Sequence, residues 1–256
     1  MTETSTTPPG RQTSWLDRLA ADRPDIILIA PMLVYLALLG LRDTSLIPFE
    51  YRWVASLLRG VGGLVVVWIL RRHLPPWGRP YWALAALMGL LIAAGWYYGQ
   101  LLCDALGLPH RLPLFPGQFD LQAHAEKFDA LRQTAAFWPM VITRIAVASV
   151  TVPIVEELFW RAFLLRALIR WDSFEKIPLG TFTLRSFLLT SLLSVLEHPD
   201  NWIVSIPCWF AFNGLMYWKK SLLFLVLVHG FTNLFLYLWV IYQAVALHNP
   251  AAWMFW

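Results

Sequence analysis

Cysteine and charge are both scarce in this chain. Of its 256 residues only two are cysteines, Cys103 and Cys208, which excludes a disulfide framework and a cysteine-rich metal site and leaves both as expected core residues. Charged residues make up 14% of the sequence and apolar residues 58%, a balance that excludes an ordinary soluble domain. The sequence also lacks an HExxH pattern, the usual signature of a zinc protease helix.

Long apolar runs dominate what is present. Runs of this length and composition predict an all-α, polytopic transmembrane helix bundle with about seven spans, within a range of six to eight. The third and seventh runs are the strongest candidates and the fifth is the weakest. The seven expected spans are Ile26–Leu41, Trp53–Leu70, Tyr81–Cys103, Trp138–Leu165, Phe182–Glu197, Trp202–Trp218 and Ser221–Leu247.

The chain reads as one membrane domain behind a polar tail. Residues 1–24 are Thr- and Pro-rich and predict a disordered cytoplasmic tail without a signal peptide, so the first span is expected to be retained. Residues 25–256 form the membrane domain, with front helices at 25–103, a connecting segment at 104–137 and the helices that carry the polar motifs at 138–247. In the connecting segment, apolar residues at helical spacing predict an amphipathic helix on the outer membrane surface, or alternatively a solvated loop helix. These residues are Phe119, Leu121, Ala125, Phe128 and Leu131.

The distribution of basic residues predicts the orientation. Most Lys and Arg residues fall in segments that are cytoplasmic if the N-terminus is inside and the C-terminus outside. The net charge of +4 is therefore explained by topology, and no nucleic-acid partner is expected. The expected location is the inner (cytoplasmic) membrane of a bacterium, with the lipid bilayer as the main partner.

Ionisable residues interrupt the fourth span in the stretch "VEELFWRAFLLR". Charged groups inside the hydrocarbon are costly, so they normally face a bundle interior or a wet cavity. Glu157 and Arg161 are four residues apart and share a helix face, where they can pair. Glu156 points about 100° away and is left for a different environment, as a general base would require. The alternative is a buried pair that only fixes helix packing.

Two further spans carry imidazole and amide groups. His198 ends the fifth span directly before Pro199, which disfavours a continued helix, and it could instead be a capping or interfacial residue. His229 and Asn233 share one face of the last span, where an interhelical hydrogen bond is the simpler explanation. Counted from the nearest basic residues, Glu156 and His229 both lie roughly 13–15 Å deep. We therefore expect these groups to meet at one level of the membrane.

A polar residue in the sixth span has a simpler interpretation. Asn213 is expected to hydrogen-bond between helices, with Gly214 beside it allowing their close approach.

Three ordered motifs now give a family resemblance. The chain resembles the CPBP family of intramembrane proteases, the Abi-like group of CAAX prenyl endopeptidases and bacteriocin-processing enzymes, including its bacterial CAAX-protease-related subgroup. The EExxxR motif is "EELFWR" at Glu156, Glu157 and Arg161, and the HxxxN motif is "HGFTN" at His229 and Asn233. The FxxxH motif is "SVLEH", with Ser194 where the family usually has phenylalanine and His198 at its end.

The resemblance implies hydrolysis of a peptide bond in a peptide or protein at the membrane. Glu156 would activate a water positioned with His198, while His229 and Asn233 would stabilise the oxyanion. Glu157 and Arg161 would orient these groups. No cofactor is implied, although Glu156, His198 and His229 are also a possible zinc ligand set.

Two other classes of function remain open. A proton-linked transporter could use the same buried groups as a relay. It would be expected to show paired repeats or matching broken helices, and the sequence has neither. A non-catalytic peptide-binding or immunity protein could use the same cavity without hydrolysis.

Overall fold

The structure is a computed structural model that describes residues 14–42, 47–114 and 120–256. Every regular element within these ranges is a helix, so the predicted all-α class is confirmed. The elements are α1 (Trp15–Asp22), α2 (Pro24–Ala37), α3 (Leu39–Arg42), η1 (Phe49–Tyr51), α4 (Arg52–Leu70), α5 (Trp82–Ala105), α6 (Leu121–Leu131), α7 (Phe137–Ala146), η2 (Val147–Thr151), α8 (Val152–Glu157), η3 (Leu158–Leu164), α9 (Leu165–Ala167), η4 (Trp171–Lys176), α10 (Leu184–Leu193), η5 (Ser194–Leu196), α11 (Trp202–Lys219), α12 (Leu222–Ile241), η6 (Tyr242–Ala246) and η7 (Pro250–Phe255).

Four helices of the described residues are long and apolar enough to cross a membrane. They are Phe49–Leu70, Trp82–Ala105, Phe137–Ala167 and Leu222–Ala246. Two shorter apolar helices, Pro24–Ala37 and Leu184–Leu196, fall in the first and fifth expected spans. Each of the seven expected spans contains a helix, while their number as membrane crossings stays a prediction.

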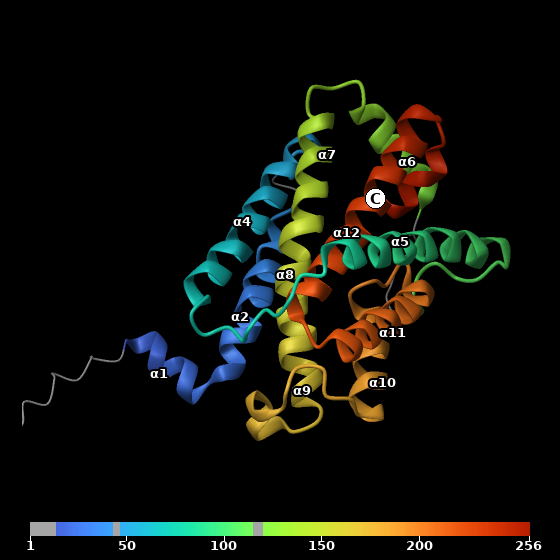
Figure 1. The fold of residues 1–256 in the computed structure, drawn as a ribbon. Helices are drawn as coiled ribbons and strands as arrows, with labels where there is room; N and C mark the ends of the chain where they lie inside the picture. Colours follow the sequence, from blue (N-terminus) through green and yellow to red (C-terminus); the bar gives the residue numbers. More distant parts are fainter. Residues whose placement is uncertain (1–13, 43–46, 115–119) are drawn as a thin grey trace, which may run out of the picture.

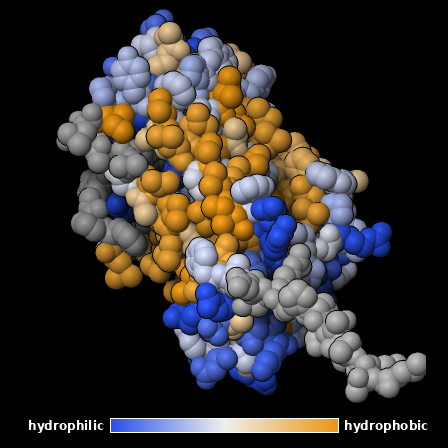
Figure 2. Space-filling view, turned by 90° about the vertical axis from the view of Figure 1, so that its left-hand side faces the viewer, coloured by the Kyte–Doolittle hydropathy of each residue, from blue (hydrophilic) through white to orange (hydrophobic). Residues whose placement is uncertain are grey.

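The surface agrees with an integral membrane protein. Figure 2 shows a broad apolar belt between two polar ends of the molecule. Large apolar side chains on α4 and α5 point away from the bundle, where only lipid could bury them. Exposed examples on these two helices are Leu57, Leu58, Val61, Val65, Trp68, Leu87, Leu90, Leu91 and Leu102.

The predicted disordered tail needs a correction at its end. Residues 1–13 lie outside the described residues, but α1 forms inside the 1–24 segment. Ser14 is its N-cap, with its side chain accepting from the backbone of Asp17, and the Asp17 side chain accepts from the backbone of Ser14 in return. This capping box satisfies two N–H groups at the start of α1. The expectation of disorder rested on the overall polarity of residues 1–24 and overlooked this local helix signal.

One long helical rod, residues 137–167, runs through the centre of the bundle (Figure 1). Two of its segments, η2 and η3, are π-helical, and they flank the short α8. In η2 the N–H of Val152 bonds to the carbonyl of Val147, five residues back, so the Ala148 carbonyl loses its usual partner. Pro153 has no N–H to give to Ser149. The Ala148 and Ser149 carbonyls, just before the two glutamates, therefore lack the regular α-helical partner four residues later.

Helix α12 packs against this part of the rod and also along α5. At Gly230 α12 comes so close to the rod that a Cβ atom would lie 2.6 Å from the carbonyl oxygen of Ser149. Only glycine fits a contact this short, because the obstacle is backbone and cannot rotate away. Gly230 thus sets the distance between His229 and the rod.

Replacement of Gly230 by alanine should destabilise the protein by about 1–3 kcal/mol, the usual penalty for overpacking a buried contact. Gly214→Ala is the matched control, because Gly214 is also helical but has no atom within 4 Å of an added Cβ. Thermal unfolding of both variants in the same detergent measures the difference. Equal melting temperatures for the two variants would show that α12 can shift to accommodate the added methyl group at little cost in stability.

The predicted amphipathic helix is present as α6, but its apolar face does not meet lipid. Ala125, Phe128 and Leu131 are buried, and the Phe128 ring stacks on Trp253 with centroids 5.0 Å apart. Trp253 belongs to η7, which lies beside α6 near the C-terminus (Figure 1). Phe119 falls outside the described residues. The helical spacing was predicted correctly, whereas the protein itself supplies the surface that the apolar face covers.

Candidate active site

The rod places the first motif at the centre of the molecule. Glu157 and Arg161 are fully buried, and Glu156 is 8% exposed. Arg161 Nη1 donates to Glu157 Oε1 at 3.2 Å, so the expected pair forms. The Arg161 guanidinium also lies over the rings of Trp209 and Phe212, at 5.1 and 5.5 Å from the ring centroids. The charge is therefore held by both a carboxylate and two aromatic faces.

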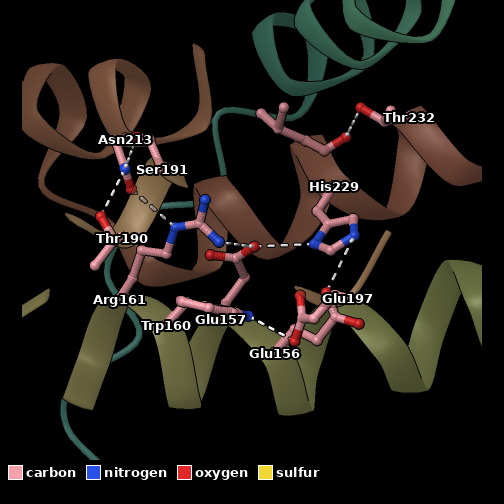
Figure 3. Close-up of polar contacts among 11 residues, drawn as sticks. Glu156, Glu157, Trp160, Arg161, Thr190, Ser191, Glu197, Asn213, His229 and Thr232 are labelled. Atoms are coloured by element: carbon pink, nitrogen blue, oxygen red, sulfur yellow. Dashed lines mark hydrogen bonds and ion pairs between the residues drawn. The ribbon is translucent and has the colours of Figure 1, made fainter. Parts of the chain in front are cut away.

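Asn213 extends this network to the neighbouring helices (Figure 3). Its Oδ1 accepts from Arg161 Nε at 3.2 Å, and its Nδ2 donates to Thr190 at 3.0 Å and Ser191 at 2.9 Å. The expected role of Asn213 between helices is confirmed. The expectation for Gly214 is wrong, because that residue is exposed and an added Cβ would meet no atom within 4 Å.

His229 connects the two glutamates. Its Nδ1 lies 2.9 Å from Glu157 Oε1, and its Nε2 lies 3.9 Å from Glu156 Oε2. Glu157 is held by Arg161 and, as a carboxylate, can only accept, so the Nδ1 atom must carry the hydrogen. The Nε2 atom then faces Glu156. The 3.9 Å gap is too long for a direct hydrogen bond, but one water molecule can bond to both groups.

Asn233 lies one turn after His229 on α12. Its Nδ2 donates to the Ala148 carbonyl at 2.7 Å, the carbonyl that the π-helical turn leaves without a backbone partner. One N–H of the amide thus fixes α12 against the rod. The amide has a second N–H, which this contact does not use.

His198 follows the short helical turn η5 and is held between two indoles. Its ring centroid lies 5.0 Å from that of Trp96 and 5.3 Å from that of Trp209. Ser194, the departure from the FxxxH motif, is fully buried and hydrogen-bonds to Ser205 on α11 at 3.2 Å. A polar side chain therefore occupies the position where the family usually has phenylalanine, and His198 still lines the interior cavity.

One cavity of about 640 Å³ brings these groups together. All four residues expected to be catalytic line it: Glu156, His198, His229 and Asn233. A stripe of rod residues forms one wall, namely Met140, Arg144, Val147, Ala148, Val152 and Glu156. From Met140 to Glu156 this stripe is about 24 Å long at the helical rise. An extended peptide of about seven residues fits that length.

The rest of the cavity wall was not expected from the sequence. Met254, Phe255 and Trp256 of the C-terminal segment line it, as do the cationic residues Arg52, Arg59, Lys127 and Arg144. Arg144 Nη2 donates to the Tyr237 hydroxyl at 3.3 Å, and its guanidinium lies 5.3 Å from the Trp256 ring centroid. The large apolar residues after Pro250 already indicate in the sequence that this segment is buried.

Glu197 is the functional candidate that sequence reasoning missed. It lines the same cavity, and its Oε1 accepts from Trp160 Nε1 at 2.8 Å. Trp160 is four residues after Glu156 on the rod, so the helix that carries Glu156 also holds Glu197 (Figure 3). The sequence signal for Glu197 was its position next to the motif residue His198, at the end of an otherwise apolar helix.

The described residues contain no group of three His, Cys, Asp or Glu side chains arranged to hold a metal ion. Cys103 and Cys208 are both buried and free, as expected of core residues, although Cys208 also contributes to the cavity wall.

Comparison with known proteins supplies the family. Residues 138–235 match the family model described as "Type II CAAX prenyl endopeptidase Rce1-like". The match supports a CPBP-family intramembrane protease. The matched segment begins at the rod and ends two residues after Asn233, so it contains all three motifs. Comparison with curated proteins gives no match, and comparison with solved structures gives none either.

The CPBP assignment agrees with the architecture. A CAAX-type intramembrane endopeptidase needs a hydrated pocket among apolar helices, and residues of α4, α5 and the rod line the cavity. The membrane character, the protease family and a peptide substrate at the bilayer follow from the match.

Proposed function

We propose that the protein hydrolyses peptide bonds of membrane-associated substrates with a water molecule activated by Glu156. The observation that carries the proposal is the gap between Glu156 Oε2 and His229 Nε2, inside a cavity that also contains His198. Glu156 Oε2 is buried without a hydrogen-bond partner, so it is available to a water molecule. Glu156 takes the proton as the water oxygen adds to the substrate carbonyl carbon.

The other residues prepare the site for the charge that develops. His198, which lines the same cavity, positions the water. His229 stabilises the oxyanion through Nε2, and it can donate there only as an imidazolium, because Nδ1 already donates to Glu157. Glu157 holds the Nδ1 side of the His229 ring, and Arg161 holds Glu157. Asn233 contributes its second N–H to the same oxyanion.

The substrate is a peptide bound along the rod, with its scissile bond at Glu156. The family description favours a prenylated C-terminal tail as the first peptide to test. We further propose about seven membrane spans in a bacterial inner membrane, with the N-terminus in the cytoplasm and the C-terminus outside. The N-terminal cations Arg18 and Arg23 support that orientation.

A cleavage assay tests the proposed function. The purified protein in lipid vesicles is incubated with a library of membrane peptides, including farnesylated C-terminal peptides, and products are identified by mass spectrometry. We expect cleavage by the unmodified protein that persists with a chelator and is lost in Glu156→Gln. Cleavage that the chelator abolishes would replace the proposed glutamate mechanism with a metal-dependent one. No cleavage of any peptide, combined with saturable peptide binding, would instead identify a binding protein.

A further inference from the structure

Two carboxyl groups, not one, face the reacting centre. Glu156 and Glu197 come from different parts of the chain and line the same cavity, and Figure 3 shows them on the same side of the His229 ring. Each has one buried oxygen, Oε2, without a hydrogen-bond partner. Two acidic oxygens are therefore free to contact substrate or water.

Arg161, the fully buried cation of the site, is engaged by other groups. Arg161 bonds to Glu157 and Asn213, and no Lys or Arg within the described ranges forms an ion pair with Glu197. The contact to Glu197 Oε1 is the neutral N–H of Trp160. Two carboxyl groups that line one cavity repel each other when both are ionised, which favours a state in which one of them keeps a proton. Such a pair supplies a base and an acid at once.

We propose that Glu197 is a second catalytic residue, the general acid that protonates the leaving amine. This inference rests on the proposed function of Glu156. The reaction begins with Glu156 ionised and Glu197 protonated at Oε2. Glu156 takes a proton from water while the water oxygen bonds to the carbonyl carbon. As the C–N bond breaks, the Glu197 proton passes to nitrogen, which leaves as a neutral amine.

The products of this step are a carboxylic acid, an amine, protonated Glu156 and ionised Glu197. Proton transfer from Glu156 to Glu197 through water restores the starting state, so no other reactant is needed. Trp160 is a positioning residue in this scheme, because its N–H fixes the Oε1 atom and directs Oε2 into the cavity.

The experiment compares two leaving groups. A peptide that the unmodified protein cleaves is paired with an analogue in which a thioester replaces the scissile amide. A thiolate leaves without a proton, because the pKa of a thiol is about 8.5, whereas an amine must be protonated first. For Glu197→Gln we expect amide cleavage to fall by about 10²- to 10⁴-fold, with thioester cleavage within about tenfold of the unmodified protein. Glu156→Gln should lose both, because both reactions need the activated water.

Glu197→Asp and Trp160→Phe provide graded variants, each expected to lower the amide-to-thioester ratio less than Glu197→Gln. Glu175→Gln, an exposed carboxyl on η4, is the control for loss of an acidic residue. Retained thioester cleavage also demonstrates that a variant is folded. An unchanged ratio in Glu197→Gln, or an equal loss of both activities, overturns the general-acid role while leaving Glu156 as the base. Failure of the unmodified protein to cleave either compound overturns the proposed function itself.

Discussion

Replacement of Glu156 by glutamine should lower peptide cleavage by about 10²- to 10⁴-fold and leave the protein folded. Glutamine has the shape of glutamate but cannot take a proton from water. The structural cost should be small, because Glu156 Oε2 has no hydrogen-bond partner and lies 3.9 Å from His229 Nε2, too far for a direct hydrogen bond. We therefore expect the free energy of unfolding to change by less than about 1 kcal/mol.

The neighbouring glutamate is the matched comparison. Glu157→Gln removes the carboxylate that holds both Arg161 and His229, so it should lower stability as well as activity. The loss of activity should be smaller, about 10- to 100-fold, because Glu157 acts through the orientation of His229. Cleavage rates and unfolding in mixed micelles measure both effects. If Glu156→Gln keeps a tenth or more of the activity, Glu156 is not the base.

The long-range layout of the site could be predicted because ionisable residues are rare in apolar helices. Glu156, Glu157, Arg161, His198, His229 and Asn233 were singled out on that ground, and the structure brings them to one region. The separation of the two glutamates also followed from helix geometry, since residues one apart cannot share a face. Helical periodicity and the cost of burying charge were sufficient for these steps.

The local backbone could not be predicted in the same way. A π-helical turn has no distinctive composition, and Pro153 was the only local signal that the rod departs from regular hydrogen bonding. That departure frees the Ala148 carbonyl for Asn233, so a contact essential to the position of α12 was invisible in the sequence. The four-residue spacing of His229 and Asn233 predicted that they share a helix face, but not which group that face contacts.

The packing partners of amphipathic segments were equally hidden. The apolar spacing in α6 predicted an amphipathic helix on the outer membrane surface, with a solvated loop helix as the alternative. The structure pairs the apolar face of α6 with the C-terminal segment through Phe128 and Trp253. Periodicity identifies which side of a helix is covered, whereas the covering surface depends on chain segments more than 100 residues away.

Removal of the Arg161 charge should give the largest loss of stability. The side chain is fully buried, and its contacts join the rod to α11 through Asn213 and to His229 through Glu157. In Arg161→Met the Glu157 carboxylate would remain buried without its cation. Breaking a buried ion pair in this way costs about 3–5 kcal/mol. We expect a correspondingly lower midpoint of unfolding in mixed micelles.

A double variant separates the lost charge balance from lost packing. In Arg161→Met/Glu157→Gln no charge of this pair is left uncompensated, so part of the stability should return even though the contact of residue 157 with His229 is weakened as well. Arg170→Met, at an exposed position soon after the rod, controls for a general loss of positive charge and should change stability by less than about 0.5 kcal/mol. If Arg161→Met alone matched Arg170→Met, the buried pair would contribute little, and the rigidity of the Glu157–His229 contact would have to come from the helix packing around it.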